Sequence, residues 1–108
     1  MHDDLHFSIT PFAELSLMEL YDILHLRDVV FVVGQKVTAE PEVDGRDPEC
    51  LHVQVRRGDE LLATARLFAS EDPIMVGRIA VRTDLQRSGV GSWMMARARL
   101  TRLRMPPE

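Results

Sequence analysis

The sequence has little of what several protein classes require. It contains a single cysteine, Cys50, so no disulfide can form within the chain. No apolar run approaches the roughly 20 residues that a membrane-spanning helix needs. Lys and Arg number 13 against 17 Asp and Glu, and the net charge of -4 gives no general electrostatic reason to bind nucleic acid. We therefore expect neither a disulfide-stabilised fold nor a membrane or nucleic-acid partner.

The sequence also lacks the marks of export and of metal binding. Its first ten residues, MHDDLHFSIT, are acidic and do not have the basic-then-apolar order of a signal peptide, so we expect a cytoplasmic location. No set of histidine, cysteine and acidic residues has the spacing of a zinc site, and we predict no metal. Cys50 stands at the start of a predicted strand, which is more typical of a buried structural thiol than of a nucleophile.

What the sequence does contain is enough apolar material for one core. Of its 108 residues 45% are hydrophobic, and we expect residues 1–108 to form a single domain. Apolar-polar alternation between turn-forming residues predicts four strands, and helical spacing predicts two helices. The predicted strands cover residues 5–10, 50–57, 61–68 and 74–82, and the predicted helices cover residues 17 to about 25 or 27 and residues 89–103.

The first predicted helix has a clear start and an open end. Ser16 and Glu19 have the spacing of a capping box, in which two side chains satisfy free N–H groups at a helix start. Residues 29–33, VVFVV, follow without a break and either end this helix or form an extended segment. Residues 34–49 hold two glycines and two prolines and are predicted to form a long loop. Helical spacing also predicts that one face of this first helix packs on the core. That face consists of Leu17, Leu20, Tyr21 and Leu24.

The strands differ in how their two faces are composed. In residues 50–57 apolar side chains at 51, 53 and 55 alternate with polar ones at 52, 54 and 56, so the two sets face opposite ways. Residues 61–68, LLATARLF, are apolar on both faces, which indicates a central strand. The order strand, helix, long loop, three strands, helix predicts an α+β fold in which helices flank a mostly antiparallel sheet.

The most informative segment joins the last predicted strand to the last predicted helix. It reads QRSGVG, from Gln86 to Gly91. Glycines let the backbone approach a ligand closely, and successive N–H groups at a helix start can hold a phosphate. The segment therefore predicts a nucleotide or coenzyme site. The alternative is a plain strand-to-helix turn that needs glycine only for its geometry.

These elements and this loop together resemble the GNAT family of acyl-CoA-dependent N-acyltransferases. The family's motif A has Gln or Arg, two residues, Gly, one residue and Gly or Ala, as at 86–91 here, after a strand similar to 77–81. A narrower resemblance, to the ElaA-like branch, is carried by Leu26-Arg27, by the segments VFVVGQ (30–35) and EVDGRD (42–47), and by His52. Together the matches span about residues 15–95.

Two features depart from the family pattern. Gly34 stands where the branch usually has Glu. The family normally continues past the motif A helix with a strand, another helix and further strands, which usually supply a tyrosine general acid and one wall of the coenzyme cleft. We therefore expect a domain that lacks this C-terminal part. The single tyrosine, Tyr21, lies in the first predicted helix and does not match that residue.

The resemblance implies a coenzyme site. Acetyl-CoA would be the co-substrate, with its pyrophosphate over the N–H groups of the loop and helix start and its pantetheine arm along the preceding strand. Arg87 would add a charge-assisted contact. The implied coenzyme-binding residues are Ile79, Ala80, Val81, Gln86, Arg87, Ser88, Gly89, Val90, Gly91 and Ser92.

Acetyl transfer also needs a base that takes a proton from the amine. The candidate catalytic residues are His52, Glu42 and Asp44, and Glu40 and Asp47 belong to the same acidic stretch. Each has a simpler interpretation. The acids are typical of a solvated loop in which Asp44-Gly45 makes a turn, and a histidine on a strand is more often structural and hydrogen-bonded.

Two function classes stay open. The first is an N-acetyltransferase that moves an acetyl group from acetyl-CoA to an amine of a small molecule or peptide. The second is a shortened, non-catalytic domain that binds acyl-CoA or a protein partner, with a degenerate fragment as its extreme case. Either way strand 74–82 would be an open edge, and open edges invite pairing, so we predict a homodimer whose partner covers it.

Overall fold

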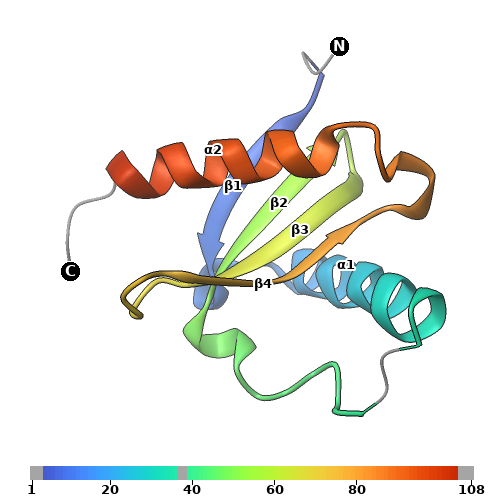
Figure 1. The fold of residues 1–108 in the computed structure, drawn as a ribbon, viewed down its shortest axis with the longest axis horizontal. Coiled ribbons are helices and arrows are strands. Elements are labelled where there is room, and N and C mark those ends of the chain that lie inside the picture. The colour runs from blue at the N-terminus through green and yellow to red at the C-terminus, as the bar shows by residue number, and fades with distance from the viewer. Residues whose placement is uncertain (1–3, 37–38, 105–108) are drawn as a thin grey trace.

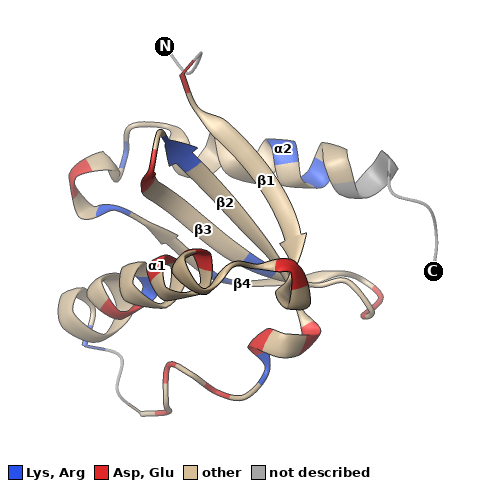
Figure 2. Ribbon diagram, turned by 180° about the vertical axis from the view of Figure 1, so that it is seen from behind, with Lys and Arg blue, Asp and Glu red and all other residues tan. Residues whose placement is uncertain are grey.

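Four antiparallel strands form one sheet, and a helix lies against each of its faces (Figure 1). The computed structural model describes residues 4–36 and 39–104. The sheet order is β1-β2-β3-β4, and α1 and α2 cover opposite faces (Figures 1 and 2). The predicted α+β fold with a helix-flanked antiparallel sheet is confirmed. The elements are β1 (His6–Pro11), α1 (Leu17–Arg27), β2 (Leu51–Arg57), β3 (Glu60–Phe68), β4 (Met75–Val81) and α2 (Val90–Arg104).

The valine-rich segment after α1 stays helical. A π-helical segment, η2 (Asp28–Gly34), continues α1, and the N–H of Gln35 donates to the carbonyl of Val30 at 3.0 Å. Of the two alternatives that the sequence left open for residues 29–33, the structure has the helical one. Three single turns of 3-10 helix complete the fold, namely η1 (Phe12–Glu14), η3 (Asp47–Glu49) and η4 (Thr83–Leu85).

The two sets of side chains along β2 face opposite ways, as predicted, and each set faces a different helix. Val53 and Val55 lie in the core cluster that contains Val90, Met94 and Ala98 of α2. His52 and Gln54 of β2 face the α1 side and are buried as well, and Arg56 is half-buried on the same side. β3 pairs with both β2 and β4, so the strand predicted to be central is central. Within the described ranges, no helix is long and apolar enough to cross a membrane.

The start of α1 is confirmed in detail. The Ser16 N–H donates to Glu19 Oε1 at 2.9 Å, and the Glu19 N–H donates to Ser16 Oγ at 3.0 Å. This is the reciprocal arrangement of a capping box, and it satisfies two N–H groups that have no intrahelical acceptor.

The predicted buried face of α1 is wrong. Leu17 is 88% exposed and Tyr21 is 67% exposed, and only Leu20 and Leu24 of that set are half-buried. The face that packs on the sheet contains Ile23, Leu26 and Arg27, followed by Val30 of η2.

The cause of this difference is the polar sheet face beneath α1. Gln54 Nε2 donates to Glu19 Oε2 at 3.0 Å, and Arg56 Nη2 donates to Asp22 Oδ2 at 3.1 Å. Acidic side chains therefore stand on the sheet-facing side of the helix, and they interrupt the apolar periodicity that sequence patterns rely on.

This reassignment predicts the effect of two substitutions on stability. Ile23→Ala should lower the free energy of unfolding by roughly 2–4 kcal/mol, because it opens a cavity in the core. Leu17→Ala should change it by less than about 0.5 kcal/mol, because Leu17 is exposed. Urea denaturation followed by circular dichroism measures both, and a loss at Leu17 equal to that at Ile23 would contradict the observed face.

Candidate functional site

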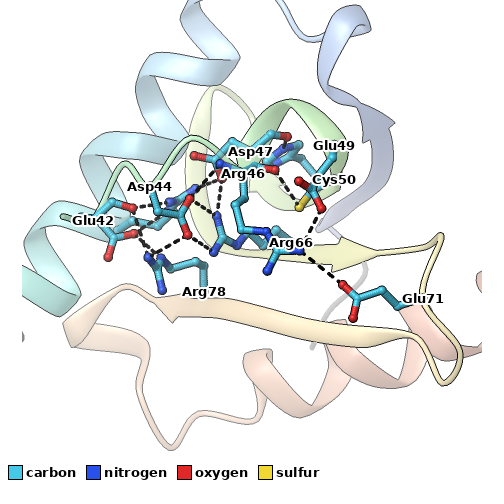
Figure 3. A network of polar contacts seen from close by, with 11 residues as sticks. Glu42, Asp44, Arg46, Asp47, Glu49, Cys50, Arg66, Glu71 and Arg78 are labelled. Carbon is cyan, nitrogen blue, oxygen red and sulfur yellow. Dashed lines mark hydrogen bonds and ion pairs between the residues drawn. The ribbon is translucent and has the colours of Figure 1, made fainter. Parts of the chain in front are cut away.

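The long loop between η2 and β2 is held by ion pairs from three different elements. Arg27 of α1, Arg66 of β3 and Arg78 of β4 converge on three carboxylates of the loop. Figure 3 shows Arg66 and Arg78 beside the three carboxylates. The three carboxylates belong to Glu42, Asp44 and Asp47. We call these six residues the ion-pair network.

Arg27 is the most deeply placed member, with 1% of its surface exposed. Its Nε donates to Glu42 Oε2 and its Nη1 donates to Asp47 Oδ1, both at 2.7 Å. Its Nη2 donates to the main-chain carbonyl of Glu42 at 3.1 Å. One guanidinium thus joins both ends of the 42–47 segment to α1.

Arg66 joins the same segment to the middle of the sheet. It donates to Asp44 Oδ2 at 2.6 Å and to Asp44 Oδ1 at 2.9 Å, and its Nη1 reaches Asp47 Oδ1 at 3.0 Å. Hydrogen bonding to Arg66 holds the pKa of Asp44 well below its usual range. Burial works to raise the pKa of Asp47, but Arg27 and then Arg66 outweigh it, so this pKa is lowered as well. Both carboxylates are therefore charged at neutral pH.

Arg78 lies in a bulge of β4. Gly77 pairs with Arg66 and Ala80 pairs with Thr64, so one extra residue lies between them on β4. Arg78 has a φ of +48°, in the left-handed region. Its side chain lies on the α1 face, where Nε is 2.9 Å from Glu42 Oε2.

His52 on β2 contacts the main chain of the loop at Asp47. The ring is completely buried, and its Nε2 lies 2.9 Å from the main-chain oxygen of Asp47. Because a carbonyl only accepts, Nε2 carries the proton, and the buried Nδ1 has no partner among the described residues. Burial lowers the pKa of His52, so the ring is neutral at physiological pH.

A cleft of about 340 Å³ opens beside the network. It lies between η2, the loop and the bulge of β4. The residues around it are Phe31, Gln35, Glu42, Gly77, Arg78 and Ile79. Of the predicted catalytic residues only Glu42 lines this cleft, whereas both oxygens of Asp44 are held by arginines and His52 is enclosed. Glu40 is exposed in the loop.

Cys50 is buried, as predicted. Its thiol donates to the carbonyl of Arg46 at 3.3 Å, and burial raises its pKa to about 11. A thiol in this state is not a nucleophile at neutral pH. Among the residues that the structure describes, no group of three or more His, Cys, Asp or Glu side chains is arranged to hold a metal ion.

The glycine loop leads from the end of β4 into α2. Arg87 and Gly89 both have left-handed backbones, with φ of +68° and +94°. The first bond of the helix runs from the Trp93 N–H to the Gly89 carbonyl at 2.9 Å, so the N–H groups of Gly91 and Ser92 precede it. These groups have no acceptor in the described part of the chain, and they lie at the positive end of the α2 dipole.

The two glycines of the loop differ in their surroundings. A Cβ atom on Gly89 would meet nothing within 4 Å. A Cβ atom on Gly91 would lie 3.3 Å from Val81 Cγ2, so glycine there allows α2 to lie close to β4. β4 is an edge of the described sheet, and the predicted coenzyme strand residues Ile79, Ala80 and Val81 are at its C-terminal end.

Comparison with known proteins agrees with this geometry. The model of the acetyltransferase (GNAT) family matches residues 17–100. The chain belongs to this family. Among curated relatives, the UPF0039 protein C11D3.02c of Schizosaccharomyces pombe is 40% identical over 97 residues, which cover 88% of this chain and 64% of that protein. Protein ElaA of Escherichia coli is 37% identical over 99 residues, covering 87% of this chain and 61% of ElaA. The chain thus spans less than two thirds of these relatives.

Solved structures of the same family share the fold. The crystal structure of Escherichia coli ElaA has a TM-score of 0.85 at 32% identity, over 96% of this chain and 73% of that one. An acyl-CoA N-acyltransferase from Pseudomonas aeruginosa has a TM-score of 0.80 at 34% identity, over 89% of this chain and 68% of that one. The predicted ElaA-like resemblance is confirmed.

Sequence reasoning missed Arg66 and Arg78 as site residues. Arg66 stands in an otherwise apolar central strand, LLATARLF, and a buried charge in such a strand needs a partner. This pattern could have identified Arg66 from the sequence. Arg78 is two residues from the buried Ala80, so strand alternation puts both on one face, and Gly77 inside the strand is a signal for the bulge.

The lowered pKa of Asp44 predicts a pH dependence of stability. A depressed folded-state pKa contributes stability that is complete above about pH 5 and is lost as the pH falls through the unfolded value and towards the lower folded value. Asp44→Asn should therefore flatten the loss of stability below about pH 5. At pH 7 it should cost roughly 2 kcal/mol, because two arginines lose a charged acceptor.

Urea denaturation from pH 7 to pH 2.5 measures this effect. The control Asp59→Asn lies in the exposed turn between β2 and β3 and should keep the wild-type slope. A wild-type slope in Asp44→Asn would show that the network does not depend on this charge.

Proposed function

We propose that this chain is an N-acetyltransferase domain that transfers an acetyl group from acetyl-CoA to an amine. The observation that carries the proposal is the run of unpartnered N–H groups at the start of α2, next to the open edge of β4, in a chain of the GNAT family. The relative of known structure titled an acyl-CoA N-acyltransferase supports the same class of donor.

The residues of the loop fit the coenzyme phosphates. Free N–H groups at a helix start bind anions, and the helix dipole adds to the attraction. Gly89 leaves open space where any other residue would place a Cβ atom, so a phosphate has room to approach the backbone. Arg87 is exposed and adds a positive charge beside this space. The proposed phosphate-binding residues are Gln86, Arg87, Ser88, Gly89, Val90, Gly91 and Ser92.

The open edge of β4 fits the pantetheine arm. An edge strand has N–H and C=O groups that point away from the sheet, and an extended amide chain can pair with them as an added strand. We assign this role to the backbone of Ile79, Ala80 and Val81. The bulge at Arg78 interrupts the edge directly before them.

We assign proton removal from the amine to Glu42. Acetyl-CoA supplies a thioester, so the transfer replaces a C–S bond by a C–N bond, takes one proton from the amine and returns one to the departing sulfur. Glu42 faces the cleft, and its Oε1 has no partner within the described ranges. Asp44 and His52, the other predicted catalytic residues, support the loop that positions Glu42.

The phosphate site can be tested with a pair of matched variants. Gly89→Glu should weaken acetyl-CoA binding at least tenfold in isothermal titration, because the new carboxylate occupies the phosphate space and repels the anion. Gly58→Glu is the control, because Gly58 also has a positive φ, +60°, and open space at its Cβ, but lies in the β2–β3 turn. Both variants carry a similar backbone strain, of about 1–2 kcal/mol.

The outcomes separate binding from turnover. Wild type and Gly58→Glu should bind acetyl-CoA and should release a free thiol when an acceptor amine is added. Equal affinity of all three proteins would overturn the phosphate site. Binding without turnover for any amine would favour the second candidate, a non-catalytic acyl-CoA-binding domain, over the enzyme.

We also propose a homodimer that forms at the N-terminal half of β4. Met75 and Val76 are 51% and 39% exposed on this edge strand, ahead of the bulge and of the stretch assigned to the coenzyme. Light scattering at micromolar concentration should show a dimer. Val76→Lys should give a monomer, because a charge on an edge strand opposes pairing. Leu17→Lys, on the exposed side of α1, should leave the dimer intact, and the opposite pattern would contradict this interface.

A further inference from the structure

The cleft beside β4 carries polar atoms that the ion-pair network does not use. Glu42 Oε2 is shared by Arg27 and Arg78, while Oε1 has no partner in the described part of the chain. Arg78 Nη2 donates to the loop, whereas its Nε lies 2.9 Å from Glu42 Oε2 without making a hydrogen bond, and its Nη1 has no acceptor among the described residues. The cleft therefore offers one free carboxylate oxygen and one free guanidinium nitrogen.

A second unpartnered donor lies behind the wall of the cleft. Arg66 is 5% exposed, and its buried Nε has no hydrogen-bond partner within the described ranges. A Cβ atom on Gly77 would lie 4.0 Å from this nitrogen. Because Gly77 lines the cleft and has no side chain, it leaves Arg66 Nε next to the cleft wall. Buried donors without acceptors are costly and are rare in folded proteins unless a ligand or water completes them.

The remaining walls are apolar. Phe31 of η2 and Ile79 of β4 line the cleft, and Ile79 is 44% exposed. The cleft of about 340 Å³ thus combines a hydrogen-bond acceptor, the guanidinium donor of Arg78 and an apolar surface, and Arg66 Nε lies behind its wall. This volume is at the lower end of the range for small-molecule sites.

We infer that the acceptor is a small amine that also carries a carboxylate and a short apolar chain. This inference rests on the proposed function and specifies its substrate class. The ammonium group is bound by Glu42 Oε1, and the carboxylate is bound by Arg78 Nη1, with Arg66 Nε beside it. The apolar chain contacts Phe31 and Ile79.

The charges of the cleft explain why both groups are needed. Arg27, Arg66 and Arg78 are balanced by three carboxylates within the network, so the site has no net charge that would draw in a simple cation or anion. A zwitterion satisfies both free atoms at once. A ligand that lacks one of its charged groups leaves an atom of the cleft unpaired, and such sites reject incomplete ligands strongly.

The same placement suits the transfer reaction. One ammonium proton passes to Glu42 Oε1, and the nitrogen lone pair then forms the C–N bond as the thioester C–S bond breaks. The nitrogen gives up a second proton as the amide forms, and the departing sulfur takes up one proton. The products are a neutral amide and a thiol, and the proton left on Glu42 is released to solvent. The carboxylate of the acceptor takes no part in bond formation, and its contact with Arg78 orients the amine.

Three ligands of matched shape test the substrate class. L-leucine has both charged groups, 3-methylbutylamine lacks the carboxylate, and 4-methylpentanoate lacks the amine. Isothermal titration of the wild-type chain should show L-leucine binding at least tenfold more tightly than either analogue. Equal binding of L-leucine and 3-methylbutylamine would overturn the inference, and so would the absence of L-leucine binding.

Two arginine variants test whether Arg78 contacts the carboxylate of the ligand. Arg78→Gln should reduce the affinity for L-leucine about tenfold or more and bring it close to that for 3-methylbutylamine, whose own affinity should not change. Arg82→Gln removes a charge of equal size just beyond β4, outside this cleft, and should leave the affinity for all three ligands unchanged. Circular dichroism should show that both variants are folded. Equal loss in the two variants would contradict a specific contact with Arg78.

A third variant adds a methyl group to the cleft wall without changing any residue of the ion-pair network. Gly77→Ala places a methyl group 4.0 Å from Arg66 Nε, which is ordinary contact, so the protein should fold. It should weaken L-leucine binding by placing a methyl group between the cleft and this buried donor. Undiminished binding in Gly77→Ala would remove Arg66 from the site.

Titration with acetyl-CoA distinguishes failure of this inference from failure of the proposed function. If acetyl-CoA binds and 3-methylbutylamine is acetylated as well as L-leucine, the acetyltransferase stands and the zwitterion inference falls. If L-leucine binds as described and acetyl-CoA does not, the cleft assignment stands as a binding site and the transferase does not.

Discussion

The architecture of the site depends on the pairing of two buried arginines and one half-buried arginine with three loop carboxylates. Arg27, Arg66 and Arg78 come from α1, β3 and β4, and their partners lie within the six residues 42–47. Each charge is costly to remove from water, and only complete pairing offsets this cost. The loop, whose described residues 39–50 have no regular structure other than η3, is therefore tied to α1 and to the sheet. The cleft lies between this loop and β4, and the ion pairs hold the loop in place beside it.

The network also divides the loop acids into two kinds. Asp44 and Asp47 are hydrogen-bonded to arginines, and their pKa values are lowered, so they are poor proton acceptors. Glu42 has one oxygen bound and one oxygen free, beside the cleft. His52 helps to place Asp47 through its main-chain oxygen. Four residues that look alike as candidates in the sequence thus differ in what their surroundings allow.

β4 connects the two halves of the proposed site. Arg78 in its bulge meets Glu42 on the α1 face, while the outer edge of the strand is open and its C-terminal end leads into the glycine loop. Gly91 lets α2 lie close against Val81, which places the helix dipole at the end of this strand. Acceptor cleft, coenzyme edge and phosphate loop are therefore features of one strand and its two ends.

Local patterns in the sequence determined the four strands, the two helices and their order, because periodicity and turn residues are short-range properties. The capping box at Ser16, the alternation along β2 and the glycine loop were all readable, and they carried the family resemblance. The buried face of α1 was misread because Glu19 and Asp22 stand on its sheet-facing side, where their partners come from β2. The bulge at Arg78, the pairing of Arg66 with Asp44 and the seclusion of His52 depend on contacts between residues far apart in the chain. Only the tertiary structure decides such contacts, since a charged side chain has the same sequence signature whether it meets solvent or a buried partner.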